Sequence, residues 1–374
     1  MEIVPLCEWF DNYSSGPFII AGPCSAESEE QLVNIASGLK GKQLPHLFRA
    51  GIWKPRTRPG SFNGVGVSGL DWLSRVKNEF GFRLTVEVAS PAHVEACLKA
   101  GVDTIWIGAR TVSNPFSVDE IAQALRGVDI PVFVKNPLNP DVDLWIGAIE
   151  RVYQAGIKRI AAIHRGFSPF EKTYYRNMPK WEIPIELRRR INNIPLICDP
   201  SHITGDSALV QEVSQKAMDL NMDGLMIEVH TDPEHALSDC NQQLTPDQYS
   251  ELMQKLIVRK PAFDDPGFIN DLEELRHQID SVDHQIVELI AQRLEIIDRI
   301  AEYKYLNNVS VLQMERWLEI LQTRTEHALS LGLDTSFTEQ VLKHLHQESI
   351  RSQTKIMQER KRQANGSSDI SVGD

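Results

Sequence analysis

The sequence predicts an α/β fold, a closed (β/α)8 TIM barrel, followed by a second domain that is all helical. Two observations support this prediction. Apolar or β-branched runs, each ending on a charged or reactive residue, recur eight times, at 18–25, 46–51, 83–88, 104–110, 131–135, 159–166, 195–202 and 224–230. The chain between consecutive runs has room for one amphipathic helix, and this repeated alternation is typical of the barrel. Beyond about residue 268, the apolar spacing is helical only.

Capping residues mark several of the barrel's helices. Residues 25–40 open with serine and acidic side chains, and 90–101 combine a serine cap, an early proline and a final glycine. Residues 245–258 are predicted to form the closing helix. The prolines and glycine of 259–267 indicate a linker between a barrel at 1–258 and a helical domain at 268–362. The tail, 363–374, is predicted to be disordered.

Composition narrows the class of protein. The net charge of −12 argues against binding to nucleic acid. Five cysteines without a CxxC pair argue against a disulfide framework. No apolar run is long enough for a membrane span, and the first residues lack the pattern of a secretory signal. We therefore expect a soluble, cytoplasmic protein.

The ends of the predicted strands carry cations. Because the carboxyl ends of the strands form the active-site face of such a barrel, these side chains should gather there. Each alone could form a salt bridge at the barrel mouth, but three neighbouring strands ending in cations favour an anion site. The loop after the second strand adds another cation and a hydroxyl, which suggests two phosphorylated substrates. The residues are Arg49, Lys54, Arg56, Thr57, Arg110, Lys135 and Arg165.

A metal site is also possible at the same end of the barrel. Cys24, His202, Glu228 and Asp239 follow strands or lie on the last loop and offer one sulfur, one nitrogen and two oxygen ligands. That mixture suits Mn, Fe, Co or Zn better than Mg or Ca. The alternatives remain that Cys24 is a small core residue and that His202 only forms loop hydrogen bonds.

The barrel resembles a known enzyme family. The strings GPCS (22–25), RAGIWKPRTRPGSFNG (49–64), GAR (108–110), DPSH (199–202) and EVHTDPEHALSDCNQQL (228–244) are similar to those of type I, β-subgroup 3-deoxy-D-arabino-heptulosonate 7-phosphate (DAHP) synthases. The resemblance covers residues 16–258. The sibling 3-deoxy-D-manno-octulosonate 8-phosphate synthases share the barrel and some metal ligands, but they have an Ala-Asn-Arg-Ser-like loop in place of residues 54–57.

The resemblance implies roles for individual residues. Cys24, His202, Glu228 and Asp239 would bind a divalent metal ion, with Mn the leading candidate. Phosphoenolpyruvate would be bound by Arg49, Lys54, Arg110, Lys135 and Arg165. Erythrose 4-phosphate would contact Arg56 and Thr57, with Asp199 near its hydroxyls. Lys54 would be catalytic, as a proton donor or charge stabiliser. His164 and Asn136-Pro137 depart from the family pattern, which has Glu and Arg-Gly there, and this affects the expected shape of the pocket.

The helical domain should begin with an unusually long helix. Apolar residues recur at helical spacing from 268 to about 305 without Pro or Gly. At about 1.5 Å per residue this helix spans roughly 55 Å, which one small three-helix subunit cannot cover, so an intertwined partner chain is expected. Further helices are predicted at 313–330 and 338–362.

Several polar residues share faces of these helices. Arg293 and Lys304 are 11 residues apart and lie on one face, whereas Arg276 is turned by roughly 100° from Arg293. All three could simply be solvated or salt-bridged. The face-sharing pairs Gln313 with Arg316, and Ser349 with Gln353, instead favour a binding site.

This domain resembles the all-helical chorismate mutases over residues 268–356, with LEELRHQIDSVDHQIVELIAQRLEIIDRIAEYK at 272–304. The resemblance implies that chorismate is bound by Arg276 of the partner chain and by Arg293, Lys304, Gln313, Arg316, Ser349 and Gln353. Arg293, Lys304 and Gln353 would be catalytic, because cations clamp two carboxylates and meet the negative charge that develops on the ether oxygen. Gln313 and Trp317 depart from the family, which often has Asp and Glu there.

Together the two resemblances imply a bifunctional enzyme of aromatic amino-acid biosynthesis. The barrel would condense phosphoenolpyruvate with erythrose 4-phosphate to DAHP and phosphate. The helical domain would form a homodimer, convert chorismate to prephenate, and let chorismate or prephenate inhibit the barrel. Two alternatives remain: an octulosonate synthase barrel, and a helical domain that only dimerises and senses ligands.

Overall fold

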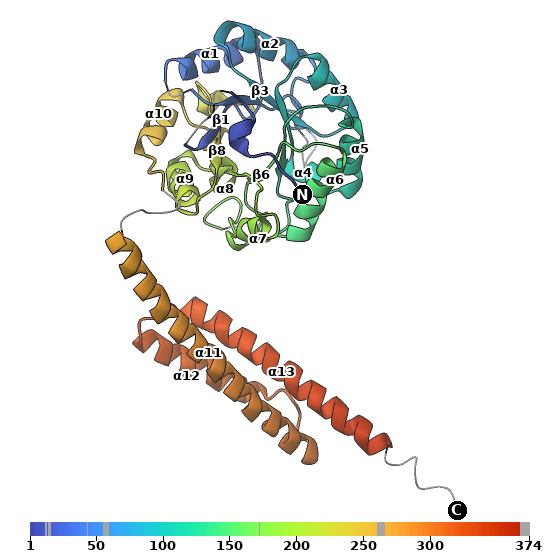
Figure 1. Cartoon of the computed structure of the whole chain (residues 1–374), viewed down its shortest axis with the longest axis vertical. Helices are drawn as coiled ribbons and strands as arrows, with labels where there is room; N and C mark the ends of the chain where they lie inside the picture. The colour runs from blue at the N-terminus through green and yellow to red at the C-terminus, as the bar shows by residue number, and fades with distance from the viewer. Residues whose placement is uncertain are drawn as a thin grey trace, which may run out of the picture. The chain divides into compact units, whose positions relative to one another are not determined.

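The computed structural model describes residues 1–11, 13, 16–42, 44–54, 60–171, 173–259 and 266–366 (Figure 1). The chain forms two compact units, residues 1–261 and 262–374. The predicted linker therefore coincides with the change of unit, although residues 260–265 lie outside the described part. Each unit is described separately below.

Parallel strands form the closed barrel predicted for the first unit. They follow each other in sequence order, and the last pairs back with the first, from Phe18↔Gly224 to Gly22↔Glu228. All eight predicted runs contain a strand. The strands are β1 (Phe18–Gly22), β2 (Leu47–Ala50), β3 (Leu84–Val88), β4 (Thr104–Ile107), β5 (Val132–Lys135), β6 (Ile160–His164), β7 (Leu196–Cys198) and β8 (Gly224–Glu228).

Helices surround the barrel in Figure 1. They are α1 (Glu29–Lys40), α2 (Ser68–Phe80), α3 (Pro91–Lys99), α4 (Ala109–Val112), α5 (Pro115–Ala124), α6 (Val142–Gln154), α7 (Glu182–Arg190), α8 (Pro200–Thr204), α9 (Val210–Asp219) and α10 (Pro246–Lys255). Short 3-10 turns are η1 (Leu6–Glu8), η2 (Ser207–Leu209), η3 (Pro233–His235) and η4 (Cys240–Gln242).

Of the two predicted serine caps, the one at residue 90 is confirmed and the one at residue 25 is not. Ser90 caps α3 by accepting from the backbone N–H of His93, and Thr245 forms a capping box with Gln248 at the start of α10. The first helix begins later than the predicted residue 25, because Ser28 is its cap and accepts from the N–H of Gln31. Ser25 instead exchanges a hydrogen bond with the hydroxyl of Ser238.

The barrel interior is filled by large side chains. Its buried apolar residues are Leu6, Trp9, Phe18, Ile20, Leu47, Trp106, Phe133, Ala161, Ile163, Ile197 and Met226. Trp9 lies before β1 and packs on Phe133, with ring centroids 5.3 Å apart. The N-terminal segment thus joins this core. A separate, larger apolar layer packs the outer face of the strands against the helices.

The second unit consists of α11 (Pro266–Leu306), α12 (Met314–Ser330) and α13 (Thr335–Gly366). The prediction of one long helix and two shorter ones is confirmed, and α11 begins within the predicted linker. The prediction of disorder from residue 363 is wrong for 363–366, because α13 continues to Gly366; residues 367–374 lie outside the described part. The sequence KRQAN at 361–365 contains Lys, Arg, Gln and Ala, which favour helix. None of the described helices is long and apolar enough to cross a membrane.

Candidate active sites

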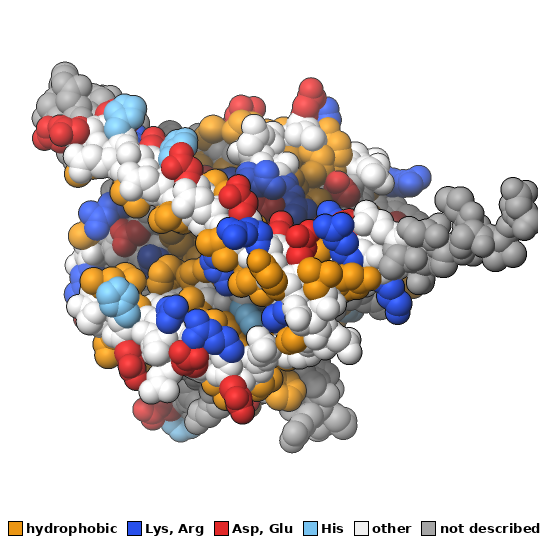
Figure 2. All heavy atoms as spheres, turned by 90° about the horizontal axis from the view of Figure 1, so that it is seen from below, with side chains coloured by type: hydrophobic (Ala, Val, Ile, Leu, Met, Phe, Trp, Pro, Cys, Tyr) orange, Lys and Arg blue, Asp and Glu red, His pale blue; other side chains and the backbone are white. Residues whose placement is uncertain are grey.

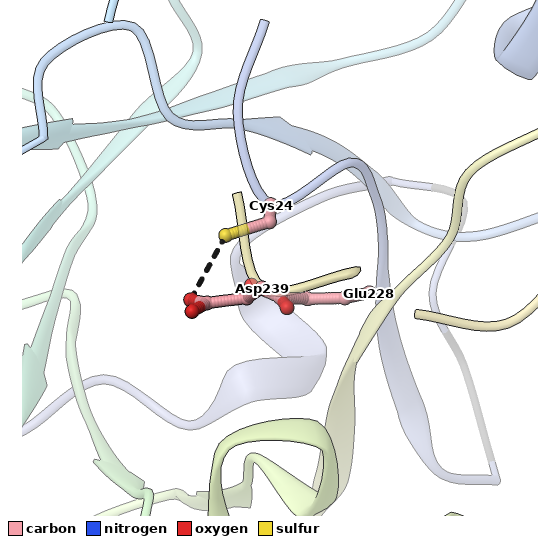
Figure 3. A group of neighbouring side chains, drawn as sticks. All are labelled: Cys24, Glu228 and Asp239. Atoms are coloured by element: carbon pink, nitrogen blue, oxygen red, sulfur yellow. Dashed lines mark hydrogen bonds between the residues drawn. The ribbon is translucent and has the colours of Figure 1, made fainter. Parts of the chain in front are cut away.

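Three of the four predicted metal ligands lie side by side at the carboxyl end of the barrel (Figure 3). Cys24 follows β1, Glu228 ends β8, and Asp239 lies on the loop after β8 with a left-handed backbone (φ 49°). One ligand atom from each lies within 4.8 Å of the others. Cys24 Sγ is 3.3 Å from Asp239 Oδ2. Residues that are 215 positions apart in sequence therefore converge on one point.

His202, the fourth predicted ligand, lies beside this cluster. Its Nε2 is 3.6 Å from Glu228 Oε1, and its Nδ1 is 3.0 Å from Asp199 Oδ1. Asp199 also caps α8 by accepting from the backbone N–H of His202 at 3.1 Å. Burial lowers the pKa of His202. The imidazole is then neutral, and a Nδ1–H bond to Asp199 leaves the Nε2 lone pair directed toward the cluster.

The donor set fits a divalent transition-metal ion. It comprises a sulfur, an imidazole nitrogen and two carboxylates, a combination that Mn, Fe, Co and Zn accept. Glu228 is fully buried, and within the described structure its Oε1 accepts no hydrogen bond of good geometry. Burial raises the pKa of the Cys24 thiol to about 12. A bound cation would instead stabilise the thiolate, so ion binding should release a proton.

Cations line a pocket next to this cluster. Its walls include Lys54, Arg110, Lys135 and Arg165, four of the predicted anion-binding residues, together with His202 and Asp239. Gly108 leaves room for the Glu87 carboxylate in the pocket wall, because a Cβ there would lie 2.1 Å from Glu87 Oε1. Anions binding in this pocket would therefore lie against both the cations and the metal-ligand cluster.

Arg49, on β2, is buried beside the metal-ligand cluster. Its Nη2 lies 3.0 Å from Glu228 Oε1, and its guanidinium lies over the Trp106 ring. Burial alone would lower the pKa of Arg49, but Glu228 and neighbouring acidic groups raise it. Nε and Nη1 are buried and have no hydrogen-bond partner in the described structure. Two unpaired donors on a charged group suit an anionic ligand.

Lys54 links the anion pocket to the metal-ligand cluster. Its Nζ donates to Cys24 Sγ at 2.9 Å and to the Cys24 carbonyl at 3.0 Å. Burial opposes its charge, but Cys24 and Glu228 raise its pKa, so the ammonium form is favoured. Gly51 allows this approach, because a Cβ there would lie 2.7 Å from the Cys24 carbonyl oxygen.

Lys135 and Arg165 come from β5 and the end of β6. Lys135 Nζ donates to Asp199 Oδ2 at 2.7 Å, and together with His202 it lowers the pKa of Asp199 well below the usual range, against the effect of burial. Burial lowers the pKa of Arg165 to about 10. Asn136 orients Arg165 by accepting from its backbone N–H at 2.7 Å. The departure Asn136-Pro137 thus has a structural role here.

Asp199 was predicted to lie near the sugar hydroxyls. Its carboxylate is fully buried and is shared between Lys135 and His202. The contact with a sugar stays a prediction. Arg56 and Thr57, the predicted sugar-phosphate contacts, lie outside the described residues.

Sequence reasoning missed Arg176. Its Nη1 donates to Asp239 Oδ1 at 3.1 Å and to Gln242 Oε1 at 2.7 Å, while Gln242 Nε2 donates to Glu228 at 2.7 Å. Arg176 also lines the cationic pocket. Arg176 lies in the long segment between β6 and α7, so the search for cations at the ends of strands could not identify it. The string DCNQQL, which includes Gln242, is the sequence feature that could have indicated a role for Gln242 in this contact.

In the helical unit, Arg293 and Ser349 meet between α11 and α13. Arg293 Nη1 donates to Ser349 Oγ at 2.7 Å and to the Leu345 carbonyl at 3.2 Å. Gln353 lies two turns from Leu345 on α13, is buried, and has an Oε1 without a hydrogen-bond partner in the described structure. Lys304 Nζ donates to the Val311 carbonyl at 2.6 Å. Burial lowers the pKa of both Arg293 and Lys304.

Other predicted residues of this site are not brought together with these within one chain. Arg276 and Arg316 are exposed and pair with Glu273 and Glu319 of their own helices. Gln313 is exposed and precedes α12 without forming a side-chain cap. Their predicted roles need a ligand or a partner chain and stay predictions.

Comparisons with known proteins agree with both halves. A family model described as "DAHP synthetase I family" matches residues 14–261, and one described as "Chorismate mutase type II" matches 275–354. A phospho-2-dehydro-3-deoxyheptonate aldolase of Thermotoga maritima is 32% identical over 238 residues, covering 64% of this chain and 68% of the relative. A 2-dehydro-3-deoxyphosphooctonate aldolase of Wolinella succinogenes is 27% identical over 267 residues, covering 64% and 98%.

A solved structure shares the barrel fold. The crystal structure of the Thermotoga maritima phospho-2-dehydro-3-deoxyheptonate aldolase (DAHP synthase) is similar with a TM-score of 0.58 and 31% identity. The match covers 64% of this chain and 68% of that one.

Proposed function

Since this chain belongs to the DAHP synthetase I family and carries a type II chorismate mutase domain, we propose how its two enzyme activities work. The barrel condenses phosphoenolpyruvate with erythrose 4-phosphate and depends on a divalent metal ion. The helical unit rearranges chorismate to prephenate without a metal ion, acts as a homodimer, and regulates the barrel.

The convergence of Cys24, Glu228, Asp239 and His202 beside a cationic pocket is the observation that supports the barrel proposal. A divalent ion bound there, Mn being the leading candidate, would act as a Lewis acid toward the aldehyde oxygen of the sugar. The unpaired donors of Arg49, with Lys135, Arg110 and Arg165, would bind the phosphate and carboxylate of phosphoenolpyruvate.

Fixed cations also bring the two anionic substrates together, which removes much of the entropic cost of their encounter. The enol carbon C3 attacks the aldehyde carbon, water adds at C2, and phosphate leaves. Lys54 lies between the anion pocket and Cys24, so its ammonium group can stabilise the alkoxide or give it a proton. The Thermotoga maritima relative supports a four-carbon sugar as the acceptor, rather than the arabinose phosphate of an octulosonate synthase.

In the helical unit, Arg293, Lys304, Ser349 and Gln353 would bind chorismate. Arg293 and Lys304 have lowered pKa values because they are partly buried, and a dicarboxylate would offset that burial. The rearrangement needs no nucleophile, because binding the substrate in a compact conformer and stabilising the ether oxygen suffice. Gln353 and Lys304 would stabilise the negative charge that develops on the ether oxygen.

A homodimer would complete this site with Arg276 of the partner chain. Support comes from α11, where a stripe of apolar side chains is exposed in the single chain: Leu275, Ile279, Val282, Ile286, Leu289 and Ile290. On the face drawn in Figure 2, exposed hydrophobic side chains lie among basic and acidic ones. An exposed stripe of this kind is typical of an interface.

Replacing Val282 by Asp should therefore dissociate the dimer and abolish chorismate turnover, because the interface would bury an unpaired charge. Sedimentation velocity, with the mutase assay on the same samples, checks this. His284→Asp introduces the same side chain at an exposed position on the opposite side of α11 and should leave a dimer. A monomeric wild-type protein would contradict the proposal.

The two reactions share no intermediate, so channelling between the sites has no purpose. We infer instead that chorismate or prephenate bound in the helical unit lowers barrel activity. Removing residues 259–374 should then leave phosphoenolpyruvate consumption insensitive to prephenate. An inhibition curve that is unchanged relative to the full chain would exclude this regulation.

A further inference from the structure

His346 lies on the face of α13 that meets Arg293. It precedes Ser349 by three residues and Gln353 by seven, so the three side chains share one face of the helix. Arg293 bonds to Ser349 and to the carbonyl of Leu345, the residue directly before His346. His346 is therefore placed at the same level of the helical unit as the cation expected to bind a substrate carboxylate.

Trp317 of α12 fixes the imidazole of His346. The two rings are stacked, with centroids 3.9 Å apart and planes 8° from parallel. A ring that is stacked on a larger aromatic surface cannot turn out of its plane without losing this contact. The direction of Nε2 is therefore set by α12 and α13 together.

His346 Nε2 has no hydrogen-bond partner among the described residues. The atom is buried and makes no hydrogen bond within the described structure, and the same is true of Gln353 Oε1 on the same face. Leaving a buried polar atom unpaired destabilises the folded protein. Such atoms are rare in folded proteins and call for a ligand or solvent as partner.

The surroundings of His346 favour a neutral ring. Burial lowers its pKa, and repulsion from Arg293 and Lys304 lowers it further. The nearby acidic residues Glu302 and Asp298 of α11 pair instead with Arg360 and Ser352 of α13. A neutral imidazole can donate one hydrogen bond from Nε2 without adding a third charge beside the two cations.

We propose that His346 is a substrate-contacting residue of the mutase site, whose Nε2–H donates a hydrogen bond to the chorismate carboxylate bound by Arg293, and that Trp317 positions its ring. This rests on the proposed binding of chorismate between α11 and α13.

Two substitutions of His346 separate a hydrogen bond from mere packing. His346→Gln retains a side-chain N–H near the position of Nε2, whereas His346→Leu retains the bulk without a donor. We expect KM for chorismate to rise about tenfold or more in His346→Leu, and to stay within about threefold of wild type in His346→Gln. His344→Leu, at an exposed position on the same helix, should leave KM unchanged.

Equal KM values in the Leu and Gln variants, whether both raised or both unchanged, would overturn the proposal and leave His346 as a packing residue. If His346→Leu does not fold, NMR of the wild-type protein labelled with 15N-histidine tests the proposal instead. The Nε2 resonance of His346, assigned by its absence in His346→Gln, should shift when prephenate is added, and a resonance that does not move would overturn the proposal.

These measurements distinguish a wrong assignment of the mutase site from a wrong role for His346. If wild-type protein neither turns over chorismate nor binds prephenate, the site itself is wrongly assigned. If the wild-type protein turns over chorismate and the Leu and Gln variants do not differ, only the role of His346 is wrong.

Discussion

Replacing Cys24 by Ala should lower the rate of phosphoenolpyruvate consumption by about a thousandfold, because a Lewis-acid metal supplies several kcal/mol to the transition state. The sulfur lies 3.3 Å from Asp239 and within the Glu228 cluster, so its loss removes one of four ligands. The rate and the metal content after dialysis, measured by mass spectrometry, should fall together. Chorismate turnover should be unchanged.

Cys97 offers a matched control. It is also buried, and burial raises its pKa to about 12, as for Cys24. It lies on α3 in the apolar layer outside the strands and has no place in the ligand cluster. Cys97→Ala should cost about 1 kcal/mol of stability and leave both rate and metal content intact. A Cys24→Ala protein with wild-type activity and full metal content would refute the ligand assignment.

Replacing Arg293 by Ala should lower chorismate turnover by about 10²–10³-fold, because a fixed cation is lost where the substrate's carboxylate binds. The side chain is held between α11 and α13 by bonds to Ser349 and Leu345. The loss should appear in kcat/KM. Phosphoenolpyruvate consumption by the barrel, measured without prephenate, should be unaffected.

The control for Arg293 is Arg351→Ala. Arg351 is 82% exposed on α13 and pairs with Glu348 of the same helix, an arrangement that contributes little. Its removal should leave turnover unchanged. If wild-type protein fails to turn over chorismate, or if Arg293→Ala retains full activity, the helical unit would be a dimerisation and sensing domain instead.

The barrel and most of its site could be predicted because (β/α)8 topology converts sequence order into spatial proximity. Cys24 follows the first strand and Glu228 ends the last, and these strands pair through Gly22↔Glu228, so their convergence follows from closure of the barrel. For the same reason Lys135, which ends β5, and Arg165, which follows β6, line one pocket. Helix faces in the second unit likewise placed Ser349 and Gln353 together.

What escaped prediction depends on long loops and on contacts between helices. Arg176 contacts Asp239 from a segment without regular structure, and the periodicity of apolar residues cannot predict such a contact. The pairing of Trp317 with His346 depends on how α12 packs on α13, which neither helix reveals alone. Asp199 binds Lys135 and His202 because β5 and β7 both end at the same face, whereas the family resemblance implied only that it lies near the sugar hydroxyls.

The central claim is that one chain contains two chemically independent sites, one that needs a metal ion and one that does not. The most direct test is a pair of assays on one purified sample, with and without a chelator. One assay follows phosphoenolpyruvate consumption with erythrose 4-phosphate, and the other follows chorismate loss. We expect the chelator to abolish the first and leave the second unchanged, with the first restored by added Mn²⁺. Full condensation activity in metal-free protein, or loss of both activities on chelation, would contradict the account.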